Sequence, residues 1–173
     1  MDFSPLLHAS PVIQVHAAAA VLALIIGAFV LFRRKGDAPH KRLGRVWVAL
    51  MALVALSSFF IWTIRLWGPF SPIHLISILT LVVLWRGVGY ARARRIALHR
   101  RTMQMTYVLA LLVTGLFTFL PGRTMYRVAF GPEGATPAKL AIFAVVLVLA
   151  SALGFAILRW RRSPQGRRFV AAH

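Results

Sequence analysis

The sequence consists of long apolar runs separated by clusters of arginine and lysine. Five runs stand out, at residues 11–32, 46–64, 72–90, 102–120 and 138–158. A helix of about twenty apolar residues crosses the hydrocarbon core of a bilayer. With 173 residues, 60% of them hydrophobic, the chain has close to the apolar content that five such helices require. We therefore expect an all-α polytopic membrane helix bundle with five transmembrane helices.

The runs divide the chain into a membrane core and flanking segments. We expect a short outer segment at residues 1–10, a four-helix core at 11–122, an outer loop at 123–137, a fifth helix at 138–158 and a basic cytoplasmic tail at 159–173. No positively charged segment precedes the first run and no small-residue cleavage site ends it. We therefore expect this run to be retained, unlike a signal peptide.

The distribution of positive charge predicts the orientation. Of the 21 lysines and arginines, six lie at residues 33–45 after the first run, six lie at residues 86–101 between the third and fourth runs, and five lie in the tail. Connections on the cytoplasmic side retain lysine and arginine. We therefore expect the N-terminus outside and the C-terminus in the cytoplasm, in a bacterial inner membrane. The four remaining cations, on the outer side, are Arg65, Arg123, Arg127 and Lys139.

Tryptophans lie near the ends of several runs. Trp47, Trp85 and Trp160 are near the predicted inner ends, and Trp62 and Trp67 are near the outer end of the second run. Tryptophan is enriched where a membrane meets water. These residues are therefore predicted to lie in interfacial aromatic belts.

Charge and composition also exclude several functions. The net charge of +18 is typical of a nucleic-acid binder. The apolar residues, however, run almost without interruption instead of in amphipathic periods, so topology and attraction to anionic lipid explain the charge and no nucleic-acid partner is expected. The absence of cysteine excludes disulfides, iron–sulfur clusters and thiolate metal sites. Asp2, Asp37 and Glu133 are the only acidic residues and lie outside the runs, which argues against carboxylate proton relays.

A short histidine pattern recurs in the two halves of the core. His40-Lys41-Arg42 precedes the second run, and His99-Arg100-Arg101 precedes the fourth. Another histidine lies upstream of each, His16 before His40 and His74 before His99. The core is thus predicted to be two similar hairpins related by an axis along the membrane normal. This symmetry pairs His16 with His74 near the outer face and His40 with His99 near the inner face.

Two facing imidazoles supply both axial ligands of a b-type haem iron, and helix bundles are where such sites are built. Ala20, Ala23 and Gly27 follow His16 on one helix face and leave room for a flat macrocycle. Arg123, with Arg65, Arg127 and the inner arginines, is expected to pair with haem propionates. The predicted iron ligands are His16, His74, His40 and His99, and one or two haems are expected.

Other interpretations of the same residues remain open. Histidines at membrane interfaces often act as amphipathic anchors or caps, and His40 and His99 lie among cations beside predicted loops. The small-residue surface at Ala20, Ala23 and Gly27 is more often used for helix packing. A metal other than haem would find an incomplete set of ligands here.

The same residues resemble a known family. The pattern comprises His16, His40-Lys41-Arg42-Leu43-Gly44-Arg45-Val46-Trp47, Ser57-Ser58-Phe59, Phe70-Ser71-Pro72-Ile73-His74, His99-Arg100-Arg101-Thr102-Met103 and Phe117-Thr118-Phe119-Leu120-Pro121-Gly122-Arg123. It resembles, over about residues 10–130, the bacterial membrane proteins of domain of unknown function family 2306. Four helices with histidine pairs on helices i and i+2 are also similar in arrangement to the transmembrane dihaem b-type cytochromes. In those cytochromes the ligands lie well within the helices, whereas His40 and His99 are at the cytoplasmic edge.

Two classes of function follow from these observations. The first is a haem-binding protein that passes electrons across or along the membrane, with a quinone or a redox protein as partner, as part of a reductase. The second is a non-redox transport component or a membrane subunit that binds lipid or partner helices through interfacial histidines. An enzyme acting on a quinone or lipid at the interface is a third, smaller class, and catalytic residues cannot be named.

Overall fold

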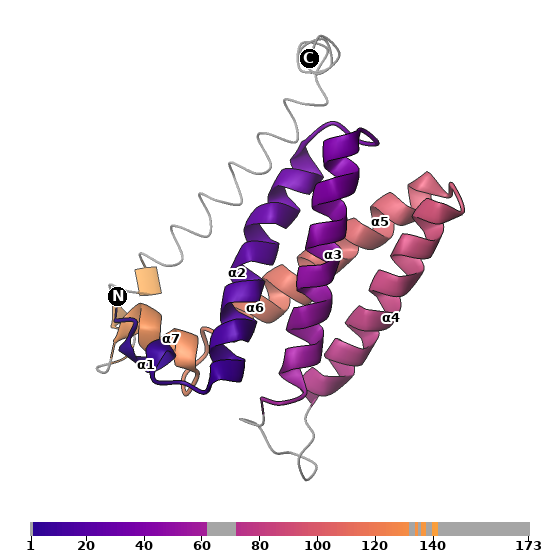
Figure 1. The fold of residues 1–173 in the computed structure, drawn as a ribbon. Helices are drawn as coiled ribbons and strands as arrows, with labels where there is room; N and C mark the ends of the chain where they lie inside the picture. Colours follow the sequence, from indigo (N-terminus) through magenta and orange to yellow (C-terminus); the bar gives the residue numbers. More distant parts are fainter. Residues whose placement is uncertain (1, 62–71, 132–133, 135, 138–139, 142–173) are drawn as a thin grey trace.

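The computed structural model describes residues 2–61 and 72–131, together with 134, 136, 137, 140 and 141. In this part of the chain the structure is all-helical, without strands, as predicted (Figure 1). The elements are α1 (Ser4–Leu7), α2 (Pro11–Phe32), α3 (Ala38–Ser58), α4 (Pro72–Arg92), α5 (Ile96–Thr106), the π-helix η1 (Tyr107–Val113), α6 (Thr114–Phe117) and α7 (Thr124–Phe130).

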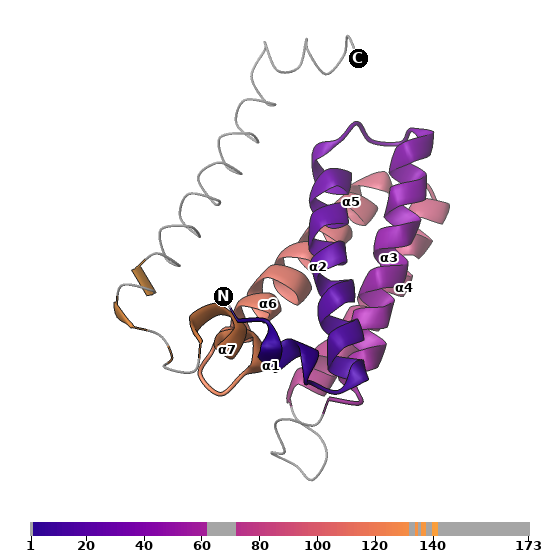
Figure 2. The same cartoon turned by 60° about the vertical axis from the view of Figure 1, so that its left-hand side comes forward.

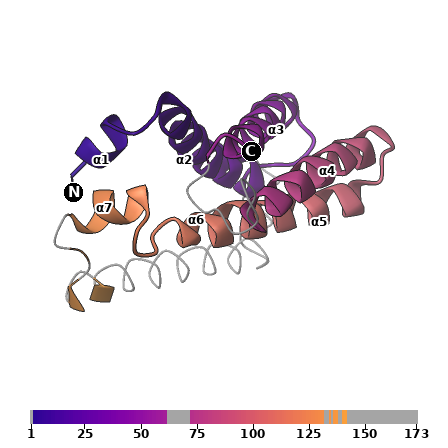
Figure 3. The ribbon, with the colours of Figure 1, turned by 90° about the horizontal axis from the view of Figure 1, so that it is seen from below.

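Two helical hairpins form the bundle. Helices α2 and α3 make the first hairpin, and α4 pairs with α5 in the second. The hairpins run in the same direction, so both tight connections lie at one end of the bundle (Figure 1). Helix α3 lies between α2 and α4, and η1 returns to pack against α2 (Figure 3). This is the arrangement expected for two similar hairpins in parallel.

Two of the described helices are long and apolar enough to cross a membrane, Pro11–Phe32 and Ile73–Arg92. Helix α3 has 21 residues, but its first turns carry Lys41, Arg42 and Arg45. The predicted fifth span, apart from two of its residues, and the whole basic tail lie outside the described residues.

The helix boundaries differ from the apolar runs at the charged end. Helix α2 coincides with the first run, but α3 begins at Ala38 instead of Val46 and ends at Ser58 instead of Ile64. Helix α5, which contains the start of the fourth run, likewise begins at Ile96, before the predicted Thr102. Apolar content locates the part of a helix in lipid, whereas capping groups decide where the helix itself begins.

Asp37 is the cap that starts α3 early. Its carboxylate accepts the backbone N–H of His40 at 2.8 Å and pairs with the Arg33 guanidinium at 2.9 Å. Lys35 donates to the carbonyls of Val30 and Leu31 at the end of α2. The loop between the two helices is therefore tied to both of them, and His40 lies in the first turn of α3.

The cap predicts a specific dependence on pH. The hydrogen bond from His40 N–H, together with Arg33, lowers the pKa of Asp37 from its ordinary value of 3.8. A lowered pKa stabilises the fold above the unfolded-state value, and this contribution is lost as pH falls through the folded-state value. Thermal unfolding in detergent should therefore show wild type losing more stability than Asp37→Asn between about pH 5 and about pH 3, because Asn caps without titrating. Equal losses in the two proteins would contradict this role, and Asp37→Ala should be less stable at both pH values.

Three helices meet closely at Gly27. A Cβ on Gly27 would lie 2.5 Å from Trp47 Nε1 and 2.6 Å from the Tyr107 ring, so only glycine fits between them. Tyr107 begins the π-helix, and its hydroxyl donates to the Leu24 carbonyl at 3.1 Å. Trp47 is only 3% exposed and belongs to the core, so its prediction as an interfacial residue was wrong. The remaining buried members of this core are Ala23, Met51, Leu84, Met103 and Leu111.

A pair of short helices lies beside the bundle. Helix α7 packs on α1, and the Asp2 N–H donates to the Val128 carbonyl at 3.1 Å (Figure 2). Val128 and Phe130 are buried in this pairing. Residues 124–130, inside the segment expected to be an outer loop, form this helix. Its seven residues include Arg127 and are too few to stand out as an apolar run.

Candidate functional site

His16 lies in α2 and reaches across to α3. Its Nδ1 is 2.9 Å from the Ser57 hydroxyl oxygen. The Ser57 hydroxyl has its own acceptors, the carbonyls of Leu53 at 2.7 Å and Val54 at 3.1 Å. With its one proton directed to these carbonyls, Ser57 accepts the Nδ1 proton of His16. His16 then carries its lone pair on Nε2.

His74 lies in the first turn of α4 and is only 4% exposed. Its ring packs against Phe59, with centroids 5.7 Å apart. Since Phe59 follows Ser57 closely in sequence, both histidines reach the same end of α3 from the helices that flank it. We call this the His16 end of the bundle.

Hydroxyl groups connect the helices at the His16 end. Ser58 on α3 and Ser77 on α4 lie 2.5 Å apart, and both are buried. The Ala55 carbonyl is also within reach of Ser58, and the Ile73 carbonyl of Ser77, so one hydroxyl donates to the other serine while the second donates to its own helix. Hydrogen bonds of this kind hold transmembrane helices together. Ser58 and Ser77 are on different helices, and the sequence spacing alone does not predict that they lie side by side.

His99 lies at the opposite end, in the first turns of α5. Its Nδ1 is 2.8 Å from the Gly87 carbonyl oxygen on α4. Because a carbonyl oxygen only accepts, Nδ1 carries the proton and the lone pair of neutral His99 is on Nε2. Met103, one turn after His99, packs against Gly87 and is buried. Gly87 thus lets α5 lie close enough to α4 for this bond to form.

His40 lies at the same end as His99, in the first turn of α3. Its Nδ1 is buried and, among the described residues, has no hydrogen-bond partner. Burial, followed by the positive charges of Lys35 and His99, lowers the pKa of His40 below its ordinary value, although Asp37 opposes this. The two histidines are therefore near enough to interact electrostatically, and His40 is held neutral. We call this the His99 end.

Two glycines near the histidines differ in their surroundings. Gly44 is one turn after His40 along α3, and a Cβ placed there would meet no atom within 4 Å. By contrast, the space beside Gly27, on the His16 face of α2, is filled by Trp47 and Tyr107. The small-residue surface that was expected to leave room for a macrocycle is therefore used for helix packing at Gly27.

Arg123, predicted to pair with propionates, directly precedes α7, and its side chain makes no capping hydrogen bond to that helix. Its guanidinium carbon lies 5.1 Å from the centroid of the Phe117 ring, which fixes it by a cation–π contact. Arg65 lies outside the described residues. Over the described ranges, no group of three or more His, Cys, Asp and Glu residues comes together to hold a metal ion.

Sequence reasoning missed the residues that hydrogen-bond to the His16 and His99 rings. Ser57 was noted only as part of a motif, and Gly87 was not noted at all. A serine or backbone carbonyl that accepts from histidine Nδ1 is recognised only when two helices are placed side by side. The helical position of His40, by contrast, could have been found from Asp37 and Pro39, which signal a helix start.

Comparison with known proteins identifies one family. The family model described as predicted membrane protein (DUF2306) matches residues 13–153. This confirms the resemblance expected from the sequence motifs. No curated protein and no solved structure matches the sequence.

Proposed function

The chain belongs to the DUF2306 family of predicted membrane proteins, and from this premise we propose that it binds b-type haem and transfers electrons in a bacterial inner membrane. In this proposal it crosses the membrane five times with its N-terminus outside. His40 and His99 ligate one haem near the inner face, and His16 and His74 ligate a second near the outer face.

The hydrogen bond from His99 Nδ1 to the Gly87 carbonyl is the observation that supports the proposal most. Histidines that bind a metal through Nε2 commonly donate Nδ1–H to a carbonyl, which fixes both the tautomer and the ring orientation. His99 has this arrangement already. Its Nε2 is therefore the nitrogen that would bind the haem iron.

His40 is a suitable partner for His99. Its lowered pKa keeps the imidazole neutral near pH 7, which ligation requires. Among the described residues the buried Nδ1 of His40 has no hydrogen-bond partner, so this side chain is not committed to another contact through that atom. The Met51 and Met103 side chains continue the same faces into the core and provide apolar surroundings. These contacts support His40 and His99 as ligands, although the sequence places both at the edge of an apolar run.

The outer pair has one comparable feature. His16 donates Nδ1–H to Ser57, so its Nε2 is also the nitrogen with the lone pair. Haem would supply an iron that cycles between two oxidation states. The protein would contribute neutral imidazoles, an apolar surrounding and arginines for the propionates, with Arg123 at the outer end and Arg100 and Arg101 beside His99.

The hydroxyl network favours a second function at the His16 end. Ser57 bonds to His16 of α2, and Ser58 of α3 bonds to Ser77 of α4, as expected for polar groups that join helices in a membrane. In that function His16 and His74 stabilise packing in a non-redox membrane subunit. Haem binding by the inner pair alone would be compatible with it.

Electron transfer is tested with the haem-loaded protein in sealed vesicles. Ferricyanide is trapped inside and membrane-impermeant dithionite is supplied outside. Each electron that crosses reduces one ferricyanide to ferrocyanide, so the absorbance of trapped ferricyanide should fall faster than in protein-free vesicles. The same rate in both preparations, with haem present in the protein, would contradict electron transfer across the membrane.

A further inference from the structure

A shallow apolar groove runs between α3 and α4. Its volume is about 300 Å³. Val48 and Ala52 line it from α3, and Leu81, Leu84, Trp85 and Val88 line it from α4. None of the paired histidines lines it, so it is separate from the candidate haem sites.

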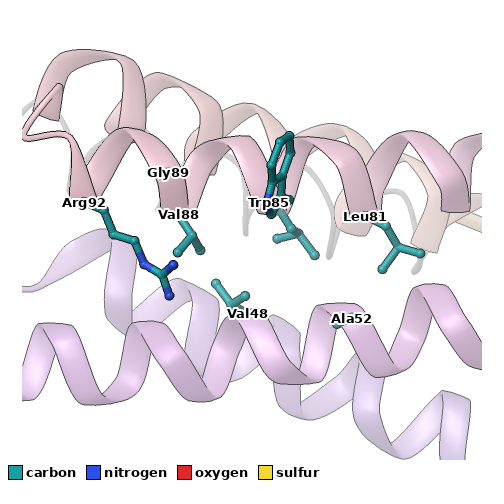
Figure 4. Close-up of a pocket in the computed structure, with 8 residues that line it drawn as sticks. Val48, Ala52, Leu81, Trp85, Val88, Gly89 and Arg92 are labelled. Carbon is teal, nitrogen blue, oxygen red and sulfur yellow. The ribbon is translucent and has the colours of Figure 1, made fainter.

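The groove exists because small residues face each other across two packed helices. Ala52 contributes little volume on α3, and a Cβ on Gly89 of α4 would meet no atom within 4 Å. Trp85 stands at its edge, 78% exposed (Figure 4). In a membrane protein, a groove on the outer surface of two neighbouring helices faces hydrocarbon chains.

Arg92 closes one end of the groove. It extends from α4 toward α3, beyond Val88 and Val48 (Figure 4). Within the described residues its guanidinium makes no hydrogen bond or ion pair, whereas Arg33 is paired with Asp37. Arg45 lies one turn before Val48 on α3, at the same basic end. The groove is therefore apolar along its length and has the positive charge of Arg92 at one end.

We propose that this groove binds a phospholipid with an anionic headgroup. One acyl chain lies along Val48, Ala52, Leu81 and Val88, and Arg92 pairs with the lipid phosphate, which in an anionic lipid has no headgroup cation of its own to neutralise it. Arginine matches a phosphate with two parallel N–H donors. The occupant is identified by charge complementarity, because a neutral tail alone would not need Arg92 at the groove's end. The site requires that the chain lies in a membrane but does not require haem.

The experiment measures quenching of Trp85 by brominated phospholipids in vesicles. The Trp85 signal is taken as the difference between the full-length protein and its Trp85→Phe variant. Dibromo-phosphatidylglycerol should quench Trp85 about fivefold more effectively, at equal mole fraction, than dibromo-phosphatidylcholine, as expected for one arginine near an anionic surface. Equal quenching by the two lipids would overturn the proposal.

Three variants separate this site from general attraction to the basic end. Arg92→Gln should abolish the headgroup preference, and Arg92→Lys should retain much of it. Arg34→Gln removes the same charge from the α2–α3 loop at that end and should leave the preference unchanged. Gly89→Leu fills the groove without changing charge and should also reduce the preference. If Arg34→Gln and Arg92→Gln act alike, or if Gly89→Leu has no effect, the lipid is attracted by overall charge and the proposed site is wrong.

Discussion

Under the haem proposal, replacing His99 with alanine is expected to reduce the bound haem by about one per chain, because it would remove one of the two proposed ligands of the inner site. The Gly87 carbonyl holds His99 by its Nδ1 at 2.8 Å, so the ring is oriented before haem binds. His40→Ala should have the same effect, since both ligands serve one iron. The haem content of the purified protein, measured after extraction, reports the loss.

A matched control and a rescue distinguish ligation from a general loss of structure. His8 is exposed and its Nδ1 bonds to the Ser4 carbonyl within α1, so His8→Ala should retain all haem. Imidazole added to a His99→Gly variant should restore the spectrum of the lost site, because free imidazole replaces the missing ligand. If His99→Ala retains the haem content of His8→Ala, the inner ligand assignment is refuted.

Gly27→Ala is expected to destabilise the bundle by about 2 to 3 kcal/mol, the upper part of the range for overpacking. The new methyl group would lie 2.5 Å from Trp47 and 2.6 Å from Tyr107, and both rings are held in the core. Tyr107 is additionally tied to α2 by its bond to the Leu24 carbonyl. Neither ring can withdraw without disturbing the contact of α2 with α3 and η1.

Gly115→Ala provides the control for Gly27→Ala. A Cβ on Gly115 would meet no atom within 4 Å, so the substitution should be neutral or stabilise the helix by up to about 1 kcal/mol. Unfolding of both variants by titration with a denaturing detergent compares them directly. Similar midpoints for the two would show that α2, α3 and η1 do not meet at Gly27 as described.

The sequence predicted the helical class, the family and the bounds of α2, because Pro11 and the Arg33-Arg34-Lys35 cluster mark its ends. It did not predict where α3 begins, since the apolar run begins only at Val46 although the helix begins at Ala38, after its cap Asp37. It also placed Trp47 at the membrane interface. Which tryptophan enters the core depends on a glycine in another helix, and a single sequence does not specify that contact.

The sequence also predicted only part of the candidate site, because contacts between helices again decide the rest. The positions of the four histidines follow from the repeat, and the structure places His16 with His74 at one end of the bundle and His40 with His99 at the other. The partners that orient two of them, Ser57 and Gly87, come from neighbouring helices. The room for a bound group was assigned to the face that includes Gly27, where Trp47 and Tyr107 fill the space. The periodicity of a sequence predicts which residues share one face of a helix. It does not predict which side chains of other helices pack against that face.

The most direct test of the haem proposal is the visible absorption spectrum of the detergent-purified full-length protein, produced with adequate haem supply, before and after dithionite. The proposal predicts a Soret band that shifts on reduction, with the sharp visible bands of a six-coordinate b-type haem that has two imidazole ligands. A protein that is folded but shows no Soret band would contradict it.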